Sequence, residues 1–273
     1  MNRTLPLAPL PRQLIINADD LGVSAARDAG ILDCFAAGAI SSASLLVDGA
    51  NAAAAAAAAT AAGLPLGLQL NLTEGPLPAP NSLTDGDGQR LGKLGLRAVP
   101  AAGRVTRKDI AGEIRRQFDR FIDLTGELPS HVDGHHHIHV EALVAEVLAP
   151  IMAREYGVHC VRLPREAGLD TLPGDAEYEA DFQCGVVRSA QAAEAVFAAA
   201  GLYSTGAFLG QSTMGMRLTA NGMASRLATL TGHGAVELMV HPGRSTDDLQ
   251  SSPFCRSPAR AHEAALLQSA AFA

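Results

Sequence analysis

The sequence predicts an α/β fold, a deformed, TIM-like (β/α) barrel with about seven parallel strands. Short apolar runs alternate with helical patterns along most of the chain. About seven such strand–helix pairs fit into 273 residues, and polar residues recur where the apolar runs end. An open, doubly wound sheet is the competing architecture. However, the turn after the first apolar run is acidic and lacks the glycines that bind phosphate.

The first predicted strand is a buried apolar run at residues 13–18, which follows a loose, proline-broken leader over residues 1–12. The run ends in the acidic pair Asp19-Asp20. Ser24 is a good N-cap, and the pattern behind it predicts a helix that extends to about residue 37.

The next two strands are predicted at 40–47 and 65–73. Between them, Asn51 precedes a run of eight alanines, the best helix formers, and predicts a capped helix. The third strand alternates polar and apolar side chains, so Gln69 and its alternate neighbours share one face. Residues 74–105 are rich in glycine and proline without a clear period, and a connection this long is typical of a lid or binding loop.

The rest of the chain continues the alternation of helix and strand. The predicted helices cover 106–126, 143–156, 189–200 and 219–230, and a closing helix starts at Pro258. The predicted strands lie at 131–133, 159–164, 204–209 and 235–240, and residues 165–187 show no regular pattern. No linker or repeat divides the chain, so residues 1–273 are expected to form a single domain.

Composition narrows the classes of function. The formal net charge is −7 without a basic stripe, which argues against nucleic acid or an anionic membrane as the main partner. No apolar run reaches the roughly 18 residues of a membrane span. The four cysteines lie far apart without a CxxC pair, which is typical of a reducing compartment, so we expect a cytoplasmic protein.

A histidine run is the densest polar motif of the chain. Five of the nine histidines fall between His131 and His139, with Asp133 among them. Buried imidazoles need hydrogen-bond partners, and burying such groups unpaired costs roughly a few kcal/mol. The usual reason to keep such a cluster is a metal ion or a proton-transfer site. An affinity tag or a solvated loop is the alternative, but this run is internal and a helical pattern follows it directly.

Polar residues also follow the other predicted strands, and the carboxyl ends of parallel strands share one face of the fold. The residues expected to meet there are Asp19, Asp20, Gln69, Asn71, Thr73, Glu74, Asp133, His135, His137, His139, Arg162, Arg165 and His241. Carboxylate and imidazole donors together suit a divalent metal. Asp20 therefore fits a metal ligand, and Asp19 fits a general base acting on metal-bound water.

Each of these residues also has a simpler interpretation. The pair Asp19-Asp20 fits the acidic first turn of a helix, where the helix dipole favours negative charge. His241 fits an ordinary turn, the two arginines fit structural ion pairs, and Glu74 fits a solvent-exposed carboxylate.

With these motifs assembled, the chain resembles the YdjC-like carbohydrate deacetylase family, whose best-known members act on chitooligosaccharides. The matching stretches run in family order over residues 16–22, 41–47, 67–75, 131–139, 161–166 and 237–243. The resemblance implies a deformed (β/α) barrel and a divalent metal, Mg²⁺ in the first place and Zn²⁺ in the second. It also implies hydrolysis of an acetamido group on an amino sugar to acetate and a free amine.

By position, the resemblance makes Asp20 and His135 metal ligands and Asp19 the general base. His241 becomes the general acid or the residue that orients the base. Asp133, His137 and His139 would either support the metal ligands or contact the substrate. Further candidate substrate contacts are Arg162, Arg165 and Phe208.

One position departs from the family. The pattern Gly-x-His-Leu-Asn-Leu-Thr-x-Gly usually places a metal-ligating histidine where this chain has Gln69. A glutamine oxygen suits Mg²⁺ or Ca²⁺ but is a poor zinc ligand. Three interpretations are open: Gln69 ligates a harder ion, another histidine compensates, or the site binds metal weakly.

The main hypothesis is a metal-dependent deacetylase acting on an N-acetylated amino sugar or oligosaccharide. One alternative is another metal-dependent hydrolase on the same scaffold, which substrate profiling would separate. A second alternative is a sugar-binding homologue that lost its metal through Gln69, which metal analysis would separate. A homodimer is an open option, because relatives in this family are often dimers.

Overall fold

The computed structural model describes residues 13–98, 103–169, 179–230, 232, 234–245 and 258–272. Its centre is a parallel six-stranded sheet in the order β4-β3-β2-β1-β6-β5. The strands are β1 (Gln13–Leu21), β2 (Ser42–Leu45), β3 (Leu66–Leu70), β4 (Val132–Gly134), β5 (Ala207–Leu209) and β6 (Ala235–Val240). The predicted leader over residues 1–12 lies outside the described residues.

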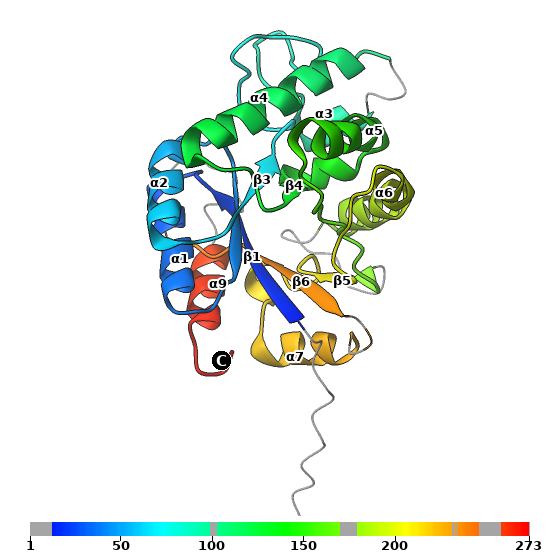
Figure 1. The fold of residues 1–273 in the computed structure, drawn as a ribbon. Coiled ribbons are helices and arrows are strands. Elements are labelled where there is room, and N and C mark those ends of the chain that lie inside the picture. Colours follow the sequence, from blue (N-terminus) through cyan, green and yellow to red (C-terminus); the bar gives the residue numbers. More distant parts are fainter. Residues whose placement is uncertain are drawn as a thin grey trace, which may run out of the picture.

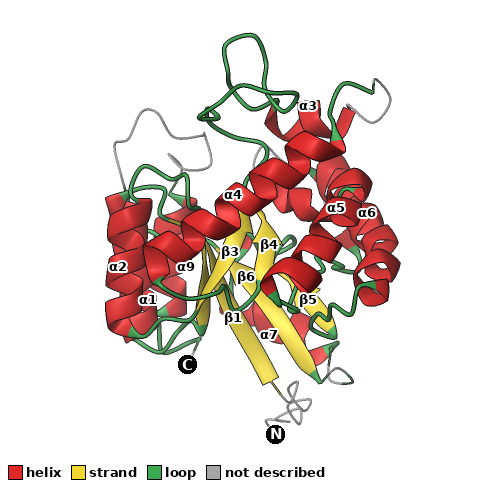
Figure 2. Ribbon diagram, turned by 45° about the horizontal axis from the view of Figure 1, so that its top comes forward, coloured by secondary structure: helices red, strands yellow, loops and turns green. Residues whose placement is uncertain are grey.

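Helices follow the strands along the chain and cover the outside of the sheet. They are α1 (Ala25–Ala36), α2 (Ala52–Ala62), α3 (Gly92–Ala98), α4 (Arg107–Thr125), α5 (Ala142–Pro150), α6 (Ala180–Ala199), α7 (Ala220–Ala228) and α9 (Ala259–Leu267). In Figure 1, α1, α2 and α9 lie along one side of the sheet, and α5 and α6 lie on the other side. Figure 2 shows the strands in the middle of the molecule with the helices around them. This arrangement confirms the predicted α/β class.

The prediction of about seven paired strands was wrong by one strand. The segment predicted as a strand at 159–164 makes only isolated bridges, Val132 with Val161 and Cys160 with Tyr203. Pro164 has no N–H with which to continue a ladder, so pairing stops there. The described part of the chain therefore forms a curled half-barrel, with residues 160–161 lying between β4 and the segment that leads into β5.

Helix boundaries differ from the prediction in the two regions that lacked a clear pattern. Helix α6 starts within 165–187, and α3 lies within 74–105. The predicted caps Ser24 and Thr106 accept backbone N–H groups as expected. Asn51 makes no side-chain cap to α2, and its side-chain amide donates to Asp28.

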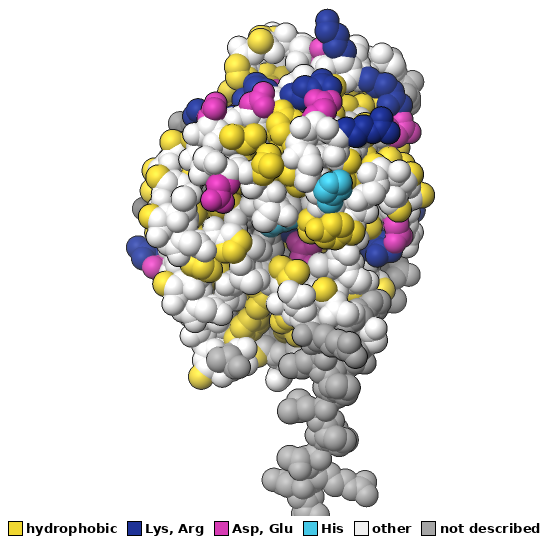
Figure 3. All heavy atoms as spheres, viewed as in Figure 1, with side chains coloured by type: hydrophobic (Ala, Val, Ile, Leu, Met, Phe, Trp, Pro, Cys, Tyr) yellow, Lys and Arg dark blue, Asp and Glu magenta, His cyan; other side chains and the backbone are white. Residues whose placement is uncertain are grey.

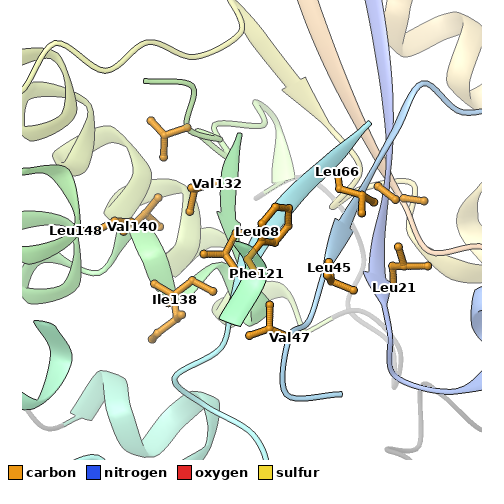
Figure 4. Packing of buried hydrophobic residues seen from close by; sticks show 14 of the residues in the cluster. Leu21, Leu45, Val47, Leu66, Leu68, Phe121, Val132, Ile138, Val140 and Leu148 are labelled. Atoms are coloured by element: carbon orange, nitrogen blue, oxygen red, sulfur yellow. The ribbon is translucent and has the colours of Figure 1, made fainter. Parts of the chain in front are cut away.

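The two faces of the curled sheet differ in chemistry because strand side chains alternate. Outward-facing leucines pack with the helices, and Figure 4 shows Leu45, Leu68 and Phe121 among the buried side chains of this core. The residues between them are polar and face inward, as the alternation of the third strand predicted. They include Asn17, Ser44, Gln69, Asp133 and Glu237, which are all buried.

The outer surface over α4 and α5 carries charges of both signs, which Figure 3 shows interspersed in the upper part of that view. Arg107 pairs with Glu146 across these helices, and Arg115 pairs with Glu155 just beyond α5. No helix within the described ranges combines the length and apolar character needed to cross a membrane.

Candidate active site

Asp19 and Asp20 lie in a β-bulge at the end of β1. Ala18 pairs with Ala43 and Leu21 pairs with Leu45, so two residues of β1 face one residue of β2. Asp20 also has a left-handed backbone with φ of 68°, which is uncommon outside glycine. Consecutive strand residues normally point to opposite faces, but this bulge directs both carboxylates to the same polar interior.

The Asp19 carboxylate accepts four hydrogen bonds. Arg162 donates two of them, from Nη1 to Oδ2 and from Nη2 to Oδ1, both at 2.7 Å. Asn17 donates to Oδ1 at 2.8 Å, and Gln69 Nε2 donates to Oδ2 at 3.2 Å. Burial acts to raise the pKa of Asp19, but the charge and hydrogen bonds of Arg162 outweigh it and the pKa is lowered. Asp19 is therefore ionised at neutral pH.

Arg162 is the positive centre of this network, and its side chain is fully buried. Its Nε donates to Glu237 at 2.7 Å, and its Nη2 lies 3.4 Å from Asp133. Ser44 of β2 also donates to Asp133. Burial raises the pKa of both Asp133 and Glu237. Sequence reasoning missed Glu237, although a carboxylate inside an apolar strand was a usable signal.

His135 lies between two carboxylates at the start of η2 (His135–Val140), a 3-10 segment after β4. Its Nδ1 is 3.1 Å from Asp20 Oδ1, and its Nε2 is 2.7 Å from Glu74 Oε2. Burial acts to lower the pKa of His135, but the two carboxylates raise it to about 10. The surroundings of this ring therefore favour a positive charge, which a proton or a bound cation can supply.

The other Asp20 oxygen, Oδ2, accepts a hydrogen bond from Arg260 of α9 at 2.6 Å. The backbone N–H of Asp20 donates to Gln69 Oε1 at 2.9 Å. Both ends of the Gln69 amide are thus engaged, one with Asp20 and the other with Asp19. Nothing in the sequence pointed to Arg260, which lies 240 residues beyond its partner.

The remaining histidines of the run are held by the fold around them. His136 and His137 both have φ of 55°, and such strained backbone is concentrated at functional sites. His136 Nδ1 lies 2.9 Å from Thr73 Oγ1, and His137 packs edge-on against Phe208. His139 Nε2 lies 2.9 Å from the Arg162 carbonyl, and burial lowers the pKa of His139 to about 3. His137 and His139 are therefore neutral, buried groups at neutral pH.

The last two candidate residues, His241 and Arg165, differ in burial. His241 follows β6 and is buried, its backbone N–H donates to Glu263, and burial lowers its pKa to about 4. The charges of Asp20 and Asp19 also act on the His241 ring. Arg165, by contrast, is partly exposed and pairs with Glu194 of α6 at 2.6 Å. The simpler interpretation, a structural ion pair, describes the contact that Arg165 makes.

A family model described as YdjC-like protein matches residues 13–273. The chain belongs to the YdjC-like family. Human carbohydrate deacetylase is 40% identical to it, over 85% of this chain and 75% of the relative. A carbohydrate deacetylase of Danio rerio is 33% identical, over 93% and 91%. A chitooligosaccharide deacetylase of Yersinia enterocolitica is 31% identical, over 90% and 87%.

The fold of this YdjC-like protein is also found in a solved structure. A crystal structure from Enterococcus faecalis V583, provisionally named a cellobiose-phosphate cleavage protein, matches with a TM-score of 0.70. The match covers 96% of this chain and 92% of the other at 21% identity. At this identity the likeness supports the α/β half-barrel and carries no argument about substrate.

The YdjC-like site contains donors that fit a divalent cation. Within the described residues, Glu74, His135 and His136 each offer a ligand atom, and these atoms lie within 4.8 Å of one another. Carboxylate oxygen and imidazole nitrogen are ordinary ligands of divalent metals. Glu74 is therefore more than a solvent-facing carboxylate, although its side chain is 55% exposed.

Proposed function

We propose that this YdjC-like protein is a metal-dependent deacetylase that hydrolyses the acetamido group of an amino sugar or oligosaccharide. The observation that supports this best is the pairing of two features in one buried site. One is the ionised Asp19, and the other is His135 between two carboxylates. Relatives named carbohydrate deacetylase and chitooligosaccharide deacetylase point to the same reaction and substrate class.

We expect the site to hold Mg²⁺ or Zn²⁺ at His135. Such an ion, when bound, polarises the amide carbonyl and makes a water molecule more acidic. The family pattern assigns the ligands to Asp20, His135 and Gln69, and the first two lie 3.1 Å apart. A carboxylate on each edge of His135 provides the negative charge that a divalent cation requires.

Asp19 takes the proton of the attacking water in this proposal. Its lowered pKa keeps it ionised and able to accept, and Arg162 holds both of its oxygens in place. The Asp19 carboxylate already accepts four hydrogen bonds, so one of these bonds must break before an oxygen can take the proton of the water. The contact with Gln69 is the longest of the four at 3.2 Å and is the one we expect to give way.

His241 delivers a proton to the leaving amine. Its pKa of about 4 makes it neutral in the free protein, so it must gain that proton during the reaction. We expect the proton to come from the attacking water by way of Asp19, whose charge acts on the His241 ring. The released nitrogen then leaves as an amine, and the acetyl group leaves as acetate.

The other buried candidate residues pack around Asp19, His135 and His241. Asp133, His139, Arg162 and Phe208 are each at most 2% exposed, so they touch the protein around them. His137 is 6% exposed and packs on Phe208. We propose that they fix the shape of the site around the sugar.

The test is acetate release from N-acetylated chitooligosaccharides by the wild type and by Asp19→Asn. We expect the variant to lose about 10²–10⁴-fold in rate, which is the usual contribution of a general base. Asp33→Asn, a half-exposed aspartate of α1, is the matched control and should keep the wild-type rate. A fully active Asp19→Asn would refute the role of Asp19. A wild type that releases no acetate from any N-acetylated sugar would refute the reaction itself.

A further inference from the structure

A hollow of about 680 Å³ lies between α3, the start of α6 and the N-terminal end of α5. Its volume falls within the range of small-molecule binding sites, roughly 300–1,000 Å³. Figures 1 and 2 both show these three helices together on one side of the molecule. The residues that line the hollow are distinct from those to which the proposed reaction gives a role.

One wall of the hollow is joined directly to the histidine run. Arg97 lines the hollow, and its Nη2 donates to the His136 carbonyl at 2.5 Å. Arg97 Nε donates to Glu141 at 2.9 Å, and Ser189 of α6 donates to the same carboxylate oxygen at 3.1 Å. The ring centroids of His136 and His135 are 4.0 Å apart. The hollow therefore adjoins the His135 end of the candidate active site.

The lining combines apolar surface with charges of both signs. Leu94 and Phe182 contribute the apolar surface, and both are at least partly exposed. Within the described ranges, Arg188 and Asp181 are the charged lining residues that form no ion pair, one of each sign. An anion would be repelled by Asp181 and a cation by Arg188. Hydroxyl groups both donate and accept hydrogen bonds, so a neutral sugar can bind the guanidinium and the carboxylate together.

Gly185 keeps one part of the hollow open. It lies inside α6, where glycine is a poor helix former, and it has no positive φ that would require a glycine. Among the described residues, a Cβ at this position would meet only Arg188 Nη2 within 4 Å, at 3.8 Å. The missing side chain therefore provides space in the hollow, and a larger residue would fill that space.

We propose that this hollow binds a further sugar unit of an N-acetylated oligosaccharide whose reacting unit lies at His135. Leu94 and Phe182 supply apolar surface for the C–H groups of the sugar ring, and Arg188 and Asp181 bind its hydroxyl groups. This deepens the proposed function and rests on it for the sugar nature of the ligand. It makes α3 and α6 determinants of chain length, because a substrate must have more than one sugar unit to reach the hollow.

The test compares kcat/KM for acetate release from N-acetylchitooligosaccharides of increasing length, up to the pentamer. Gly185→Leu fills the hollow and replaces a poor helix former by a good one, so the variant should fold. We expect the ratio of kcat/KM for the pentamer to that for the shortest sugar hydrolysed to fall about tenfold, because contacts with remote sugar units are lost. Arg188→Gln removes the unpaired guanidinium and should lower the same ratio about threefold.

A matched control and a binding measurement complete the design. Gly112→Leu changes an exposed glycine of α4 whose Cβ would meet nothing within 4 Å, and it should leave the ratio unchanged. Calorimetric titration of Asp19→Asn with the pentamer measures the Kd apart from turnover. Adding Gly185→Leu to Asp19→Asn should raise this Kd about tenfold. Circular dichroism confirms that each variant is folded.

Two results would overturn this assignment. One is an unchanged ratio in Gly185→Leu, and the other is a fall in kcat/KM of equal size for every chain length, which indicates damage to the reacting site instead. The outcome is separable from that of the deacetylase assay. A pentamer Kd that depends on Gly185 without acetate release would contradict the reaction alone. Acetate release with a ratio and a Kd insensitive to Gly185 would contradict this sugar site alone.

Discussion

Replacement of Arg162 by methionine should show how strongly the buried charge network depends on its one guanidinium. Arg162→Met keeps a long apolar stem and removes three charge-assisted hydrogen bonds of 2.7 Å. Two of these bonds end on Asp19 and one ends on Glu237. The variant leaves the buried Asp19 carboxylate without its guanidinium partner.

The expected loss of stability follows from these contacts. Stranding one partner of a buried ion pair costs about 3–5 kcal/mol. Two of the three lost bonds end on Asp19, so Asp19 accounts for most of the stranded charge. We therefore expect Arg162→Met to lower the free energy of unfolding by about 3–5 kcal/mol at pH 7.

The loss should also depend on pH, with a definite sign. Without Arg162, burial becomes the dominant influence on Asp19 and raises its pKa above the value of the unfolded chain. A carboxyl group of this kind destabilises the fold as the pH rises from the unfolded to the folded pKa. The deficit of the variant should therefore shrink on acidification from pH 8 to pH 5.

Urea unfolding at both pH values measures these differences, and Arg165→Met is the matched control. Arg165 forms an equally short ion pair with Glu194, at 2.6 Å, but its side chain is 27% exposed. Exposed pairs contribute about 0–1 kcal/mol. The reasoning fails if the two variants lose the same stability, or if the loss in Arg162→Met is independent of pH.

Two further predictions concern the strand that carries the histidine run. The free energy of unfolding should fall as the pH drops from 6.5 towards 4, because burial lowers the pKa of His131 to about 4 and the unfolded chain then binds the extra proton. The effect is roughly 3 kcal/mol. Urea titrations at pH 7 and 4.5 should show that the free energy of unfolding decreases less on acidification in His131→Gln than in the wild type; equal decreases would contradict this. Gly134→Ala should destabilise by about 1–3 kcal/mol, because its Cβ would lie 2.7 Å from His139 Nδ1 and 2.9 Å from the His139 backbone nitrogen. Gly112→Ala in α4, whose Cβ meets nothing within 4 Å, should instead be neutral or stabilise by up to about 1 kcal/mol, and thermal unfolding of both variants would reveal any departure from this order.

Local patterns in the sequence predicted many of the strands and helices. Alternation in the third strand placed Gln69 on the polar face, and the caps Ser24 and Thr106 marked helix starts. These features depend on neighbours close in the chain, so they are visible in a short stretch of sequence. The prediction failed for the strand at 159–164, where pairing depends on a distant partner and on Pro164.

The candidate site could be predicted in part. The rule that strand ends share one face brought Asp19, Asp20 and His135 together correctly. The direction of each side chain was not predictable, because a bulge turns two consecutive aspartates into the same interior. Arg260 was missed for the same kind of reason, since its contact with Asp20 joins the two ends of the described chain.

By itself, the sequence determined the α/β class, the order of most elements and the set of polar residues at the strand ends. Periodicity and capping are local properties, so they can be recognised in the sequence without knowledge of the fold. Only the tertiary structure decided that Gln69 is engaged at both ends and that His135 faces Glu74 as well as Asp20. Those contacts depend on strand register, sheet curl and helix packing, which join residues that are far apart in the chain.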